Sequence, residues 1–316
     1  MTNQTKRGGL GSEIAGLMHK NIRNYAMYIA LAVIFIVFQI LSKGAFLTAR
    51  NLTNLINQTG YIAVMAVGMT LVLIICQIDL SVGYVAGFLG ACAAQLLLRG
   101  VPAGLAVLII LIAGAIIGLL QGLVIGRIGV PAFVTTLACE FIFRGLLTLV
   151  TEASGTIPVT NEVFNNLSNG FLPEVFMIGQ LHGLTIIVGL LAIVAIIVSQ
   201  IRQRKELKKY NFEIVSMPIF VFKIVFFTAL IAALTYVLAA YNGLSWTIVI
   251  VALIAGVYAF VMNKTRTGRY IYGMGGNREA AALSGVNVRR VLIGVFTSMG
   301  CMAALGGILY TSRLGA

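Results

Sequence analysis

The feature that most constrains this chain is a series of long apolar runs, which recur from one end of the sequence to the other. A helix needs about 20 apolar residues to cross a bilayer. The chain is 59% hydrophobic and 10% charged, whereas charged residues make up about 25% of a soluble globular domain. We therefore expect an integral membrane protein, built as an all-α, polytopic transmembrane helix bundle.

The apolar runs predict nine spans. Their approximate ranges are 25–42, 59–78, 80–98, 102–126, 131–150, 182–200, 218–240, 245–262 and 291–311. A short amphipathic segment, 44–57, is expected on the outer side between the first two spans. The first run follows four basic residues and has no small-residue cleavage site behind it, so we expect an uncleaved span rather than a signal peptide.

Basic residues gather in three segments, 1–24, 201–216 and 263–290, while the polar stretch 151–181 contains three glutamates and no Lys or Arg. Basic loops of membrane proteins stay in the cytoplasm. This predicts a cytoplasmic N-terminus, two cytoplasmic loops at 201–216 and 263–290, and a periplasmic loop at 151–181, in a single transmembrane domain over 1–316. The net charge of +13 then reflects orientation in the membrane, and nucleic acid is not an expected partner.

Glycines recur every four residues along the fourth predicted span, at Gly114, Gly118, Gly122 and Gly126, and the spacing returns at Gly83 and Gly87. Small residues at this spacing let a second helix backbone approach closely. We expect both sets to be faces for helix packing.

Few ionisable residues lie in or beside the apolar runs. Asp79, in "QIDLSVG", is the only aspartate and lies between two predicted spans. We expect it to cap the following helix, with Ser81 adding a local side-chain hydrogen bond; direct contact with a transported solute is the alternative. Glu140 and Arg144 are four residues apart, so on one helix they are expected to form a mutually neutralised pair.

The sequence contains no signature of an enzyme. HExxH, GxSxG and the Walker A loop are absent, and "GMGGN" at 273–277 lacks the Lys-Ser/Thr of a phosphate loop. The four cysteines are dispersed without CxxC spacing, so they support neither a disulfide framework nor a metal site. We expect no cofactor.

One polar, alanine-rich stretch interrupts the apolar C-terminal part: "GGNREAAALSGVNVRR", residues 275–290. Within it, Glu279, Ala280 and Ala281 are followed after three residues by Gly285. This order resembles the core of the loop by which permeases of bacterial ABC importers engage their ATPase. The resemblance implies a short helix over 275–288, docked in a groove of an ATPase. Arg278 and Glu279 would orient it, Ala280 and Ala281 would be buried at the contact, and Gly285 would let the chain turn in a left-handed conformation.

Longer segments resemble the permeases of the ribose, xylose and galactose class of ABC sugar importers. These are "FLTARNLTNLINQTGYIAVMAVGMT", "MAVGMTLVLIICQIDLSVG", "GVPAFVTTLACEFIFRGL" and "GRYIYGMGGNREAAALSGVNV". The insertion 200–240 is similar to the xylose or multiple-sugar branch. The I-x-L-P end of the general importer loop is missing after Gly285. Family members continue into further spans past Ala316, so we expect a chain truncated at its C-terminus.

The resemblance implies the permease subunit of an importer that moves a monosaccharide, a pentose or hexose, across the bacterial inner membrane. Its implied partners are a cytoplasmic ATPase subunit that hydrolyses ATP, a periplasmic sugar-binding protein, a second permease copy and the lipid bilayer. The main alternative is an ion-coupled secondary transporter of a small polar solute, which would place ionisable groups or broken helices at the bilayer midplane. A membrane-embedded enzyme and a scaffold role are further alternatives.

Overall fold

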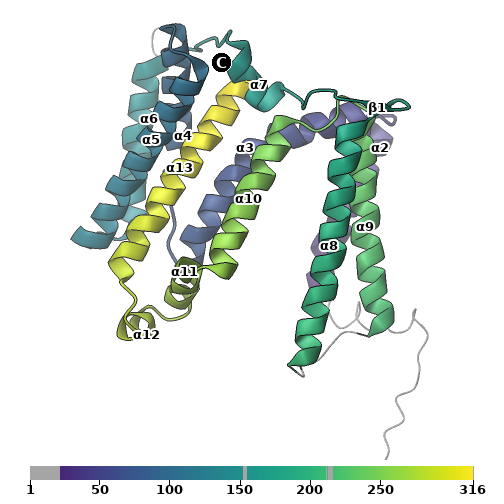
Figure 1. Ribbon diagram of the computed structural model, residues 1–316. Coiled ribbons are helices and arrows are strands. Elements are labelled where there is room, and N and C mark those ends of the chain that lie inside the picture. The colour runs from purple at the N-terminus through teal and green to yellow at the C-terminus, as the bar shows by residue number, and fades with distance from the viewer. Residues whose placement is uncertain (1–21, 152–154, 211, 213–215, 316) are drawn as a thin grey trace, which may run out of the picture. The chain divides into compact units, whose positions relative to one another are not determined.

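The structure is a computed structural model that describes residues 22–151, 155–210, 212 and 216–315 (Figure 1). Most of the predicted N-terminal segment 1–24 lies outside the described residues. Helices account for most of the described chain. They are α2 (Ile22–Leu41), α3 (Ala49–Ile74), α4 (Val82–Leu98), α5 (Ala103–Leu123), the π-helical turn η1 (Val124–Ile128), α6 (Ala132–Thr151), α7 (Glu162–Asn169), α8 (Gly183–Lys209), α9 (Met217–Ala239), α10 (Trp246–Lys264), α11 (Arg266–Gly276), α12 (Arg278–Leu283) and α13 (Val288–Leu314). Two short strands, β1 (Met177–Ile178) and β2 (Leu181–His182), pair antiparallel.

Among the described residues, seven helices are long and apolar enough to cross a membrane, which confirms an all-α polytopic membrane protein. They are α3, α5 with η1, α6, α8, α9, α10 and α13. The two other predicted spans correspond to α2 and α4, whose described apolar stretches, Ala30–Leu41 and Val82–Leu98, are shorter. The predicted segment 44–57 is not separate from the span after it, because α3 begins at Ala49 and continues unbroken to Ile74.

The chain divides into two compact units. The first comprises Met1–Thr53 with Glu174–Gly243, and the second comprises Asn54–Pro173 with Leu244–Ala316. In the first unit, α8 and α9 form a helical hairpin. The two helices are close at Gly189, where an added Cβ would lie 2.3 Å from the Thr235 side chain.

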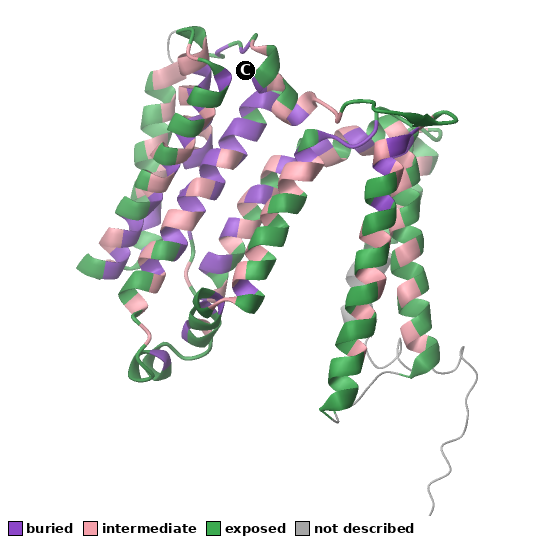
Figure 2. Cartoon of the chain, viewed as in Figure 1, coloured by how far each residue is buried: buried purple, intermediate pink, exposed green. Residues whose placement is uncertain are grey.

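In the second unit α13 is the central helix and packs against α4 and α5. Figure 2 shows buried residues along most of its length. The predicted glycine face of α5 and η1 lies against this helix. A Cβ added at Gly114 would lie 2.5 Å from the Gly300 carbonyl oxygen, and one at Gly118 would lie 2.2 Å from the Phe296 carbonyl oxygen. The two backbones therefore touch.

The remaining predicted packing glycines differ among themselves. Gly122 and Gly126 continue the face, with added Cβ atoms 2.8 Å from Ile293 and 3.1 Å from the Arg289 carbonyl oxygen. At Gly87 a Cβ would meet Leu147 at 3.3 Å. At Gly83 a Cβ would meet no described atom within 4 Å, so the prediction of a packing contact at Gly83 is wrong within the described chain.

The C-terminal end of α13 is tied to α7, a helix inside the predicted loop 151–181. Asn161 caps α7 by accepting from the Phe164 N–H, as its side-chain chemistry favours. The Ser312 hydroxyl donates to the Phe164 carbonyl oxygen at 2.8 Å and accepts from the Ser168 N–H at 3.0 Å. Since α13 has 27 residues, this end lies roughly 40 Å from its start beside α12, which is enough to span a bilayer.

Candidate functional site

The second unit contains an interruption between α3 and α4. Residues 75–81, the interruption loop, have no regular helix, and Cys76 has a φ of +55°. Non-helical backbone between membrane-spanning helices persists only where its polar groups find partners within the protein or in water. The hydrogen bonds of the interruption loop therefore decide whether it is stable.

Asp79 supplies those bonds at the end of the loop. Its Oδ1 accepts from the Ser81 N–H at 2.9 Å and from the Ser81 hydroxyl at 2.7 Å. Ser81 Oγ in turn accepts from Gln121 Nε2 on α5 at 2.8 Å. All three residues are buried. The cluster holds the loop to α5, which is why a carboxylate can lie among apolar helices.

The prediction for Asp79 needs one correction. Ser81, not Asp79, occupies the N-cap position of α4, and it makes no side-chain capping bond. Asp79 instead bonds two residues ahead, as an Asx turn does. Sequence reasoning missed Gln121, although a single amide in the apolar, glycine-rich helix α5 is a signal for a buried polar partner.

The predicted pair Glu140 and Arg144 is not formed. Among the residues that the structure describes, no ion pair joins the two side chains, and Arg144 is exposed. Its guanidinium carbon lies 5.8 Å from the centroid of the Tyr84 ring, in reach of a cation–π attraction. The spacing of four residues placed them on one side of α6 but did not decide where the long Arg side chain would go.

The predicted coupling helix, 275–288, is shorter in the structure: only α12 (Arg278–Leu283) lies within it, between the end of α11 and the start of α13. Asn277 ends α11 and caps α12, where its Oδ1 accepts from the Ala280 N–H at 2.9 Å. Gly285 has a φ of +85°, the left-handed conformation that its glycine predicts. Because one residue joins the two helices, a displacement of α12 passes directly to α11.

The burial of α12 corrects the prediction for its alanines. Ala281 is buried inside this chain, so it is not free to contact a partner. Ala280, Arg278 and Glu279 are exposed, and Leu283 is 91% exposed. Figure 2 shows most of α12 exposed. The exposed side chains of α12 are therefore two charged residues, two alanines (Ala280 and Ala282) and Leu283.

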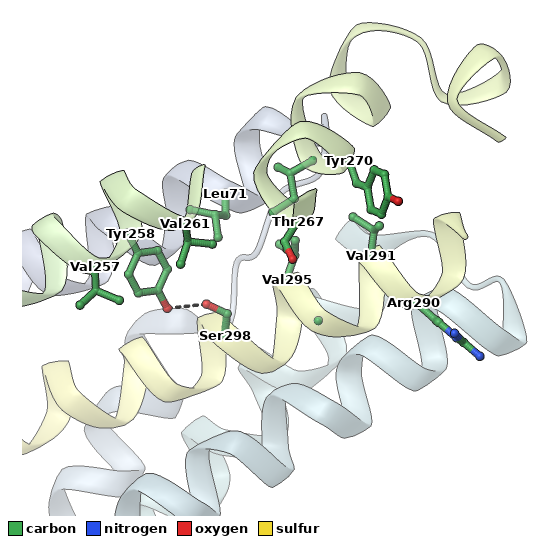
Figure 3. Close-up of a pocket in the computed structure, with 12 residues that line it drawn as sticks. Leu71, Val257, Tyr258, Val261, Thr267, Tyr270, Arg290, Val291, Val295 and Ser298 are labelled. Carbon is green, nitrogen blue, oxygen red and sulfur yellow. Dashed lines mark hydrogen bonds between the residues drawn. The ribbon is translucent and has the colours of Figure 1, made fainter. Parts of the chain in front are cut away.

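An apolar pocket of about 500 Å³ lies beside this segment, between α10, α11 and α13 (Figure 3). At one end the Tyr258 hydroxyl and the Ser298 hydroxyl share a hydrogen bond. At the other end Arg290 is directed away from the remaining lining side chains. The pocket brings together no pair of catalytic groups; it leaves room beside α11.

Comparison with known proteins identifies the kind of molecule. Residues 51–316 match a family described as the permease component of the branched-chain amino acid transport system. The chain belongs to this permease family. The xylose transport system permease protein of Haemophilus influenzae is 31% identical to the permease, over 94% of this chain and 77% of the relative. The ribose import permease protein of Escherichia coli K12 is 31% identical, over 100% of this chain and 76% of the relative. No solved structure matches.

Family membership decides the class of function. The permease is a transport component of an ABC importer and not an enzyme, because the family supplies the membrane passage while a separate subunit hydrolyses ATP. It is a multi-pass protein of the bacterial inner membrane. The partners that follow for this class are an ATPase and a periplasmic binding protein.

Proposed function

We propose that this chain is the transmembrane permease subunit of an ABC importer that carries a pentose or hexose monosaccharide. The family description names branched-chain amino acids, but xylose and ribose permeases match the chain over nearly its whole length. A periplasmic binding protein delivers the sugar, a cytoplasmic ATPase supplies the energy, and two copies of the permease enclose the pathway.

The orientation that we propose has the N-terminus, 201–216 and 263–290 in the cytoplasm and 151–181 in the periplasm, with nine spans between them. The charge distribution supports this arrangement, as does the placement of α7 and α12 at opposite ends of α13. Cysteines introduced at Glu162 and at Lys205 provide a test with an impermeant thiol reagent on intact cells. If the reagent labels Lys205→Cys but not Glu162→Cys, the permease has the opposite orientation in the membrane.

The exposed face of α12 is the main observation that supports a contact with the ATPase. Leu283 is 91% exposed on a short, capped helix in a basic segment. Full burial of such a side chain contributes about 1.5–3 kcal/mol, or roughly 10- to 150-fold in affinity. An apolar anchor flanked by charges fits the groove of a protein partner better than open water.

The test is Leu283→Asp in the permease co-expressed with its ATPase. We expect the affinity of the ATPase for the membranes to fall roughly 10- to 150-fold. The folded yield of the permease should stay unchanged, because Leu283 contributes little to the interior. Leu314→Asp is the matched control, since Leu314 is 59% exposed at the other end of α13. If Leu283→Asp and Leu314→Asp membranes retain equal amounts of ATPase, α12 is not the element that docks on the ATPase.

A further inference from the structure

The interruption loop is held firmly at one end and weakly at the other. Its end at Asp79 and Ser81 is buried and bonded to Gln121. At the other end Cys76 is exposed, and Ile78, which is 52% exposed, is bonded to α6 only through its carbonyl oxygen, which accepts from the Thr136 hydroxyl at 3.4 Å. A displacement of the loop therefore meets least resistance at residues 76–78.

The last turn of α11 lies directly on the start of this loop. A Cβ added at Gly275 would lie 2.0 Å from the Ile74 carbonyl oxygen, so only glycine fits without a shift of backbone. Cys76 Sγ lies 3.7 Å from the Gly275 carbonyl oxygen. Met274, next to Gly275, and Ile271, one turn earlier on α11, are buried in a core that includes Leu71 and Ile75. Close backbone contact and a shared core join α11 to the end of α3.

Space for movement adjoins this contact on the side of the loop. A cavity of about 410 Å³ is lined by Cys76, Gln77 and Ile78 together with Arg278 at the start of α12. The apolar pocket of Figure 3 borders α11 as well. Protein interiors are close-packed and resist displacement, so one cavity beside the interruption loop and another beside α11 mark the place where this part of the unit can shift.

We propose that Gly275 is a positioning residue for transport: through its contact with Ile74, movement of α12 on the ATPase displaces residues 76–78 of the interruption loop. The inference rests on the proposed function. Asn277 makes α11 and α12 move together, Gly275 transmits the movement, and the Asp79–Ser81–Gln121 cluster is the fixed point against which the loop bends.

Gly275→Ala tests the contact, and Gly273→Ala on the same helix is the control, because a Cβ at Gly273 would meet no described atom within 4 Å. We expect Gly275→Ala to keep ATPase retention and ATP hydrolysis near wild type. Uptake of D-xylose or D-ribose, with the binding protein present, should fall roughly 5- to 150-fold, the range set by overpacking a tight contact. Gly273→Ala should preserve uptake.

Labelling of Cys76 gives a second measurement that does not depend on the identity of the sugar. Cys92, Cys139 and Cys301, which are partly buried, are replaced by alanine, and maleimide labelling of Cys76 is followed in the complex with its ATPase. We expect a non-hydrolysable ATP analogue to change the labelling rate in the parent and in Gly273→Ala, and the response to be lost in Gly275→Ala.

The outcomes separate the two proposals. If the ATPase binds but the analogue leaves Cys76 labelling unchanged in the parent, the inference is wrong and the proposed function stands. The same holds if Gly275→Ala transports and responds like Gly273→Ala. If no ATPase associates with the parent, the proposed function fails and the inference fails with it.

Discussion

Helices α13 and α9 show how differently the two units bury apolar surface. In α13, 61% of the residues in the apolar window are buried within the chain, whereas in α9 none of the window residues is buried in the described structure. Both helices are apolar along their length. The difference lies in the neighbours: α13 meets the glycine face of α5, while α9 packs mainly against α8 in the described structure.

Buried side-chain atoms without a partner among the described residues are more numerous in the first unit (Thr53 Oγ1, His182 Nε2 and Thr228 Oγ1) than in the second (Asn165 Oδ1). In the second unit the buried carboxylate of Asp79 and the amide of Gln121 both have partners in Ser81. In the first unit His182 is buried and bonds Thr185 through Nδ1, while its Nε2 has no partner among the described residues. An unpaired buried polar atom weakens a fold. We infer that the second unit is the rigid part of the chain and that the first tolerates more change.

The largest effect is expected where backbone touches backbone. Gly118→Ala places a Cβ 2.2 Å from the Phe296 carbonyl oxygen, and neither backbone can rotate away as a side chain does. We expect a loss of at least about 1–3 kcal/mol in the free energy of unfolding, seen as a lower melting temperature of the purified protein in detergent.

Gly104→Ala on the same helix is the control, because a Cβ there would meet no described atom within 4 Å. Alanine is favoured over glycine within a helix by about 1 kcal/mol, so this variant should melt at the wild-type temperature or above. If Gly118→Ala proves as stable as Gly104→Ala, the close packing of α5 against α13 is not what makes the second unit rigid.

A smaller effect is expected at the buried polar cluster. Asp79→Leu removes the acceptor for the Ser81 N–H and hydroxyl, and an unpaired buried group costs about 1–3 kcal/mol. Asp79→Asn keeps an oxygen in the same place and should retain most of the folded yield and transport. A well-folded but inactive Asp79→Asn protein would instead show that the negative charge acts in transport.

The sequence predicted most of the fold because the length and composition of apolar runs are local properties. Each of the nine predicted spans corresponds to a helix, and the spacing of Gly114, Gly118, Gly122 and Gly126 predicted a face that in the structure lies on α13. The same spacing failed at Gly83 because a glycine pattern indicates that close approach is possible but does not supply a neighbour.

The site was less predictable because its residues come from distant parts of the chain. The EAA-like stretch indicated a short helix over 275–288, of which only Arg278–Leu283 forms α12, and a left-handed glycine at 285, where φ is +85°. It did not show which alanine faces inward, since that depends on how α11 and α12 pack on the unit. The bond from Gln121 to Ser81 spans 40 residues, and the contact from Gly275 to Ile74 spans two hundred. Neither leaves a local pattern.

The smallest effect is expected in the first unit, at Gly189 on α8. A Cβ there would lie 2.3 Å from Thr235 Cγ2, a clash with a side chain rather than with backbone. The branched Thr235 has few rotamers in a helix and cannot avoid the new methyl completely, but a small tilt of α9 relieves the overlap. Since alanine also gains about 1 kcal/mol of helix propensity over glycine, Gly189→Ala should change the free energy of unfolding by less than about 1 kcal/mol.

Removing the opposing methyl in Gly189→Ala/Thr235→Ala should recover the loss, with a coupling energy of roughly 0.5 kcal/mol or more in the double-mutant cycle. A Gly189→Ala loss as large as that of Gly118→Ala would mean that the α8–α9 hairpin is packed as rigidly as the second unit, and the contrast between the units would fail.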